Sequence, residues 1–149
     1  MKPIEHFKNT EQFLTYAEWW RHKLFLDDWL IKFKLIDDNT ETDSDTETDS
    51  NVVGMCNSNF INKEAVIIVK NTDIVDTLVT RNIAELNLVH ELLHIKFEYL
   101  GCADVQDEEL AELSEGEQVY YLQRHQALEQ MAKTLLSVKY DLDFSYFNH

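Results

Sequence analysis

The sequence is poor in glycine, proline and cysteine. Its 149 residues include three glycines and one proline. Because all-β sandwiches and barrels join many short strands through turns rich in these residues, such a fold is disfavoured and helices should dominate. The two cysteines, Cys56 and Cys102, could form at most one bridge, which excludes a disulfide framework and a cysteine-based zinc site. We therefore expect a reducing compartment.

Basic residues and long apolar runs are also scarce. Lys and Arg number 13 against 28 Asp and Glu, and the formal net charge of −15 has the wrong sign for neutralising nucleic-acid phosphates. The chain contains no stretch of about 18 apolar residues, and its first residues, MKPIEHFKNTEQF, lack the apolar core of a signal peptide. These features predict a cytoplasmic protein without nucleic-acid or membrane partners.

The chain does contain enough apolar material for one packed domain spanning 1–149. Hydrophobic residues make up 44% of the sequence, a share typical of globular proteins. Helical spacing of apolar residues, with Thr10 as the expected first cap, predicts helices over 10–25, 80–100 and 107–138. Alternation or a short apolar run predicts strands over 29–35, 52–56 and 65–69. The last strand should be buried on both faces or packed beneath a helix, and together the elements predict an α+β domain with a small three-stranded sheet.

Residues 37–51, DDNTETDSDTETDSN, form an acidic low-complexity loop. Seven of its fifteen positions are Asp or Glu and six of the others are Thr or Ser. The alternating acids from Asp43 to Asp49 resemble a calcium loop, but the glycine and the distal glutamate of an EF-hand are missing. A solvated, self-repelling loop is the favoured interpretation, with calcium binding as the alternative.

An HExxH sequence, HELLH at 90–94, lies inside the helix predicted for 80–100. His90 and His94 differ by about 40° around a helix, so both rings can reach one metal ion, and they lie in its apolar stripe. Glu91 points beside that centre, where it can serve as general base toward a zinc-activated water. The alternatives are two buried structural histidines and, for Glu91, an ordinary surface carboxylate.

A catalytic zinc needs a third protein ligand. In the last predicted helix, His125 falls inside the apolar arc and Glu129 at its edge. We expect His125 to bind Zn²⁺ and Glu129 to accept a hydrogen bond from a ligand histidine. The reverse assignment stays open, because zinc also accepts carboxylate oxygens. Five further acids belong to a charge-dense run typical of a solvated face: Glu108, Glu109, Glu112, Glu115 and Glu117.

The stretch LVHELLHIKF, followed further along by HQALEQMAKTLL, resembles the metallopeptidases of phages and prophages, small single-domain zincins related to the ImmA/IrrE-like group. The resemblance extends from Trp29 to about Leu136, and its specific part is these two helices. In that family the last helix typically reads Glu-x-x-Ile or Ala-Asn or Asp-x-x-Ala, with the leading glutamate as third ligand. His125 stands in that slot here and Glu129 in the Asn or Asp slot, so an imidazole replaces the family's acidic ligand.

The resemblance implies a zincin-like minimal domain, in which a small three-stranded, mostly antiparallel sheet packs on the HExxH helix, with further helices at both ends. It also implies a zinc-dependent metallopeptidase, a hydrolase of phage or prophage origin, with a peptide or protein substrate whose identity stays open. Tyr99, Tyr120 or Tyr121 is a candidate for stabilising the oxyanion, although core packing is the favoured role for each.

Two rival interpretations come from other classes. The charge of −15 and the loop 37–51 would suit an acidic, non-catalytic binding or inhibitor protein that occupies DNA-binding surfaces of a host protein, although such charge also serves plain solubility. The other rival is a catalytically inactive zincin fold that retains a metal site. A SprT-like DNA-linked protease, which also has three histidines, fits less well because the chain has no basic stretch for DNA.

Overall fold

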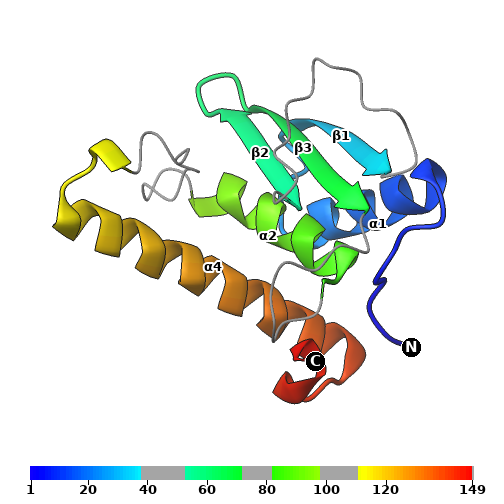
Figure 1. The fold of residues 1–149 in the computed structure, drawn as a ribbon. Coiled ribbons are helices and arrows are strands. Elements are labelled where there is room, and N and C mark those ends of the chain that lie inside the picture. The colour runs from blue at the N-terminus through cyan, green and yellow to red at the C-terminus, as the bar shows by residue number, and fades with distance from the viewer. Residues whose placement is uncertain (38–52, 72–81, 98–110, 149) are drawn as a thin grey trace.

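Figure 1 shows the computed structural model, which describes residues 1–37, 53–71, 82–97 and 111–148. The described elements form an α+β fold, as expected from the sequence. In chain order they are α1 (Thr10–Lys23), β1 (Leu30–Asp37), β2 (Gly54–Asn59), β3 (Glu64–Asn71), α2 (Ala84–Phe97), α4 (Glu115–Tyr140) and the 3-10 helix η2 (Phe144–Phe147).

The three strands form one mixed sheet in the order β1-β3-β2. The pair β2–β3 is antiparallel, because the short connection between Asn59 and Glu64 can only return the chain alongside itself. The pair β1–β3 is parallel along its whole length, from Leu30 opposite Glu64 to Asp37 opposite Asn71. The expectation of a mostly antiparallel sheet is therefore wrong for β1, which reaches its partner only after β2 has intervened in the chain.

The helices lie on one side of the sheet, with α2 between the sheet and α4 (Figure 1). In β3, Ile67 and Val69 are fully buried toward the helices, whereas Val66 on the opposite face is 36% exposed. Of the two arrangements predicted for this strand, packing beneath a helix is thus confirmed. Helix α2 is buried almost all round, because it contacts both β2 and β3 as well as α1 and α4.

Local signals change how two of the predicted helices begin. The N-cap of α1 is Asn9 rather than Thr10, since the Asn9 side chain accepts a hydrogen bond of 2.8 Å from the Gln12 N–H. The helix expected over 107–138 is interrupted before α4, where the Ser114 side chain caps the new helix through the Glu117 N–H. Several predictions concern residues outside the described part: the loop 38–51 with its calcium alternative, the ends of the helix 80–100, Tyr99, Cys102, Glu108 and Glu109.

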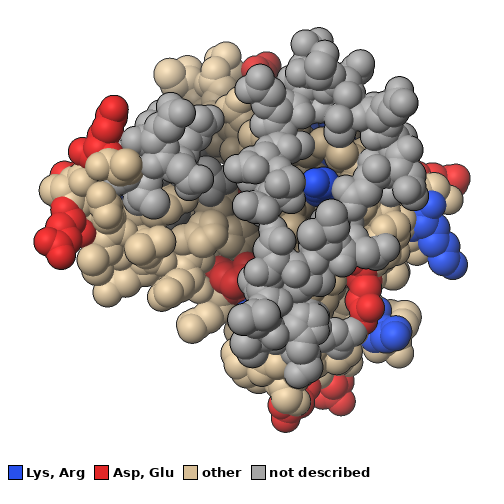
Figure 2. Space-filling view, in the orientation of Figure 1, with Lys and Arg blue, Asp and Glu red and all other residues tan. Residues whose placement is uncertain are grey.

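No helix in the described part of the chain is long and apolar enough to cross a membrane. Figure 2 shows how charge is distributed on one face of the molecule. The described Asp and Glu side chains on this face stand in several separate groups, at its edges and near its middle, and the described Lys and Arg side chains gather mainly along one side. The described part of this face therefore carries its negative charge as dispersed groups rather than as one continuous array.

Candidate metal centre

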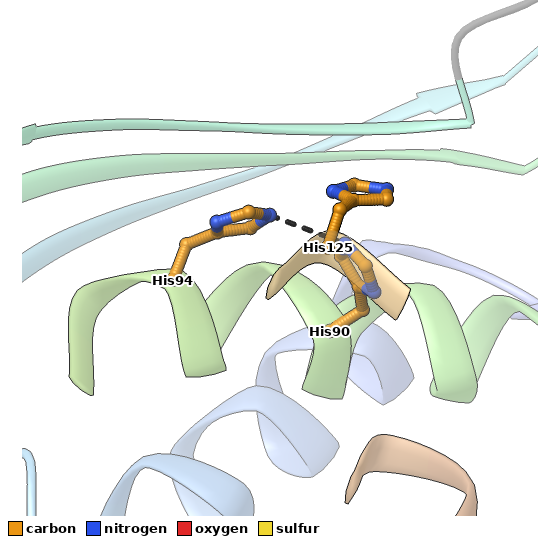
Figure 3. Close-up of side chains that lie close together, drawn as sticks. All are labelled: His90, His94 and His125. Atoms are coloured by element: carbon orange, nitrogen blue, oxygen red, sulfur yellow. Dashed lines mark hydrogen bonds between the residues drawn. The ribbon is translucent and has the colours of Figure 1, made fainter. Parts of the chain in front are cut away.

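Two helices bring three histidines together. His90 and His94 lie one turn apart on α2 and are 6% and 3% exposed, and α4 contributes the half-buried His125. One ring nitrogen from each of the three lies within 4.8 Å of the others. Figure 3 shows the three rings converging, two from α2 and one from the helix that crosses it. The histidines chosen from the sequence are thus close enough to bind one metal ion.

The spacing within the pair on α2 suits a tetrahedral ion. His94 Nε2 lies 3.1 Å from His90 Nε2. Two nitrogens bound at about 2.0–2.1 Å to one tetrahedral zinc would be about 3.3 Å apart. The centroid of the His125 ring lies 4.7 Å from the centroid of the His90 ring and 5.7 Å from that of the His94 ring, so the three imidazoles form a triangle. Such a donor set suits zinc and several other divalent transition metals.

Glu129 contacts the centre through His90. Its Oε2 lies 2.7 Å from His90 Nδ1, and because an ionised carboxylate can only accept, the hydrogen of this bond belongs to the ring. Burial raises the pKa of Glu129, but the hydrogen bond with His90 and the charges of His90, Lys133 and His125 outweigh it and leave this pKa below its ordinary value. A proton held on Nδ1 leaves a lone pair on His90 Nε2, the atom that faces His94.

Glu91 is 6% exposed, so the interpretation as an ordinary surface carboxylate is wrong. Its side chain packs against the backbone where β2 begins: a Cβ added to Gly54 would lie 3.0 Å from both Cγ and Oε1 of Glu91. The carboxylate is therefore confined between the HExxH helix and the edge strand of the described sheet. This contact was not predicted, although an isolated glycine in a strand signals close approach of another group to the backbone.

The tyrosine candidates differ in their surroundings. The Tyr121 ring is half-buried and stacks on His125 with centroids 6.0 Å apart, which places it beside the centre. Tyr120 is 56% exposed, with the Arg124 guanidinium 3.6 Å above its ring, so its expected role in core packing is wrong. Among the described acids of the charge-dense run, all are exposed, as predicted for a solvated face: Glu112, Glu115 and Glu117.

A buried carboxylate on the same helix was also missed. Glu85 is 0% exposed, and its only sequence signal is its position between apolar neighbours in a helix that is apolar almost all round.

Comparison of the chain with protein-family models, with curated proteins and with solved structures found no match.

Proposed function

We propose that the protein is a zinc-dependent metallopeptidase in which His90, His94 and His125 hold the ion and Glu91 is the general base. The observation that carries this proposal is the convergence of three imidazole nitrogens within 4.8 Å, with the buried Glu91 carboxylate on the same helix as two of them. Three histidine ligands leave one tetrahedral position for water or substrate, which is the arrangement of catalytic rather than structural zinc sites. The resemblance to phage and prophage zincins supports the same reaction class.

The roles of the carboxylates follow from their positions. Zinc at this site would lower the pKa of a coordinated water to about 7 and polarise the substrate carbonyl. Glu91 follows His90 directly in the chain, and its side chain packs against Gly54, so the carboxylate has little freedom to change its orientation. It would take the proton from the attacking water and return it to the leaving nitrogen. Glu129 would keep the His90 ring in the tautomer that presents Nε2 to the ion.

The edge strand β2 offers a place for an extended substrate. Lys70 N–H donates to Val53 C=O at 2.9 Å, so this pair bonds across the β2–β3 ladder. Because bonded and non-bonded pairs alternate in antiparallel sheets, the main-chain groups of Gly54, Cys56 and Ser58 point away from β3. A peptide that adds to this edge of the described sheet would form hydrogen bonds with the main chain of Gly54 and pass alongside Glu91.

The test combines metal content with hydrolysis. On protein purified without a metal-affinity tag, we expect about one zinc per chain, retained in Glu91→Gln and lost in His125→Ala. Weakened binding is expected in Glu129→Ala, because the carboxylate only orients His90. The matched control is His22→Ala, since the His22 side chain is 75% exposed and lies outside the histidine cluster.

Activity is then measured by mass spectrometry on a mixture of peptides. The wild type should cleave a subset of them and Glu91→Gln none, although both carry zinc. A wild type that contains no metal even after zinc is added back would refute the proposal. Loss of zinc in Glu129→Ala together with its retention in His125→Ala would identify Glu129 rather than His125 as the third ligand.

A further inference from the structure

Glu85 joins three parts of the chain through one buried carboxylate. Its Oε1 accepts hydrogen bonds of 2.8 Å from Trp20 Nε1 on α1 and from Lys139 Nζ on α4. The Tyr140 hydroxyl, also on α4, lies 2.8 Å from both carboxylate oxygens, and the Ile4 N–H donates to Oε2 at 2.9 Å. Both carboxylate oxygens therefore accept two or more hydrogen bonds, and most of the donors belong to α1 or α4.

Lys139 is held in this cluster with little water around it. Its side chain is 15% exposed, and its ammonium lies over four aromatic rings with centroids between 4.1 and 4.9 Å away: Tyr16, Trp19, Trp20 and Tyr140. The ring faces and the Glu85 carboxylate replace the hydration shell of the ammonium. An ion pair removed from water in this way depends strongly on geometry, because neither charge can turn to solvent when the partner moves.

Apart from the Glu129–His90 hydrogen bond beside the histidines themselves, the remaining contacts of α4 with the core define its position along α2 less sharply. The buried residues of α4 recur every fourth position, Leu128, Ala132 and Leu136 before Tyr140. Such a ridge fits a groove of a neighbouring helix, but apolar contacts are not directional, and a shift of one repeat would present similar side chains. A shift by four residues would displace His125 by about 6 Å along the helix axis, which is beyond the reach of a metal–ligand bond.

We propose that Glu85 is a positioning residue for the metal centre. Through Lys139 and Tyr140 it fixes α4 at the axial register in which His125 reaches the ion held by His90 and His94. The proposal rests on the zinc site proposed above. It assigns a role to a carboxylate that touches neither metal nor substrate and that lies before the HExxH sequence on α2.

The test compares donors to the same carboxylate that come from different helices. Tyr140→Phe and Lys139→Met remove the contacts from α4, and the matched control Trp20→Phe removes one from α1. The dissociation constant for zinc is measured by competition with a chromophoric chelator, at a temperature where far-UV circular dichroism shows each variant to be fully folded. Thermal unfolding of the metal-free proteins measures the loss of stability separately.

We expect all three variants to unfold at lower temperature than the wild type. Only the two α4 variants should bind zinc more weakly, by about 10-fold or more, while Trp20→Phe stays within about 2-fold of the wild type. A residue with a merely structural role would lower the unfolding temperature without changing the zinc affinity of the folded molecules. Lys139→Arg keeps the positive charge and should bind zinc more tightly than Lys139→Met. Tyr140→Phe retains the aromatic ring and is the variant most expected to fold.

Three outcomes would overturn the proposal. If both α4 variants bind zinc as tightly as the wild type, Glu85 does not position the centre, and the proposed function stands. If Trp20→Phe weakens zinc binding as much as Tyr140→Phe, the effect is general loosening rather than the register of α4. If the wild type itself binds no zinc, the proposed function fails, and there is no metal centre for Glu85 to position.

Discussion

Replacement of Gly54 by alanine tests the contact that confines Glu91. The added methyl carbon would lie 3.0 Å from Cγ and Oε1 of Glu91 and 3.3 Å from its Cδ. Carbon atoms pack best at about 3.5–4.0 Å, so one of the two groups has to move by several tenths of an ångström. The strand β2 and the buried helix α2 both resist this displacement.

The expected cost can be worked out from two opposing effects. Overpacking of a buried site costs about 1–3 kcal/mol, and replacing glycine in an unstrained strand returns about 0.4–1 kcal/mol by restricting the unfolded chain. Gly54→Ala should therefore lower the free energy of unfolding by up to about 2.5 kcal/mol. Gly116→Ala is the matched control, because a Cβ there meets nothing within 4 Å, and it should stabilise the protein by about 0.4–1 kcal/mol.

The assay is urea unfolding of the metal-free protein, followed by tryptophan fluorescence, in a double-mutant cycle with Glu91→Ala. Truncating Glu91 removes all three contacts, so Gly54→Ala in that background should become neutral or stabilising, like Gly116→Ala. The coupling between the two positions should be about 1–3 kcal/mol. An equal effect of Gly54→Ala in both backgrounds would refute the reasoning, because the cost would then have nothing to do with the carboxylate.

Other predictions concern the fold and the centre. Asn71→Leu should cost about 2–4 kcal/mol in chemical denaturation, since the Asn71 side chain accepts from Phe7 N–H at 2.9 Å and donates to Phe7 C=O at 2.7 Å, both buried; a cost below 1 kcal/mol would contradict this. Zinc at about 100 times its dissociation constant should stabilise the wild type by about 2.7 kcal/mol in thermal unfolding and leave His94→Ala unchanged. The pKa of Glu129 is lowered on folding, so this carboxylate stabilises the native state above its unfolded pKa of about 4.3, and that contribution is lost as the pH falls through the folded value. The metal-free Glu129→Gln variant should therefore lose less stability than the wild type between about pH 5 and pH 3. If the free energy of unfolding of both proteins fell equally over this range, Glu129 would not have this role.

The parts of the centre that depend on helical period could be predicted from the sequence. His90 and His94 share a face because four residues nearly complete a turn, whatever the rest of the chain does. The apolar arc of the last helix likewise indicated that His125 faces inward. Both inferences concern the direction in which a side chain leaves its own helix, which is a local property of the sequence.

Contacts between elements could not be predicted in the same way. A helical wheel gives the side of α4 that packs but not its position along α2. The hydrogen bond of Glu129 with a ligand histidine was therefore predicted without the identity of that histidine, His90, and the pairing of Lys139 with Glu85 was missed. Strand patterns likewise give the buried face of β1 but not the direction of its partner, which is why the parallel pairing with β3 was not predicted. Register and partner choice are set by packing between segments far apart in the chain.

Because Gly54 and Glu91 fit closely together, the residues that position 54 can accept during evolution depend on the residue at position 91. While a glutamate occupies position 91, any side chain at position 54 crowds it, so selection for the carboxylate is also selection for glycine in the strand. A lineage that replaced Glu91 with a smaller residue would release that constraint. Glycine at position 54 would therefore serve, among diverging copies of this chain, as a record of whether the carboxylate beside the histidines is still in use.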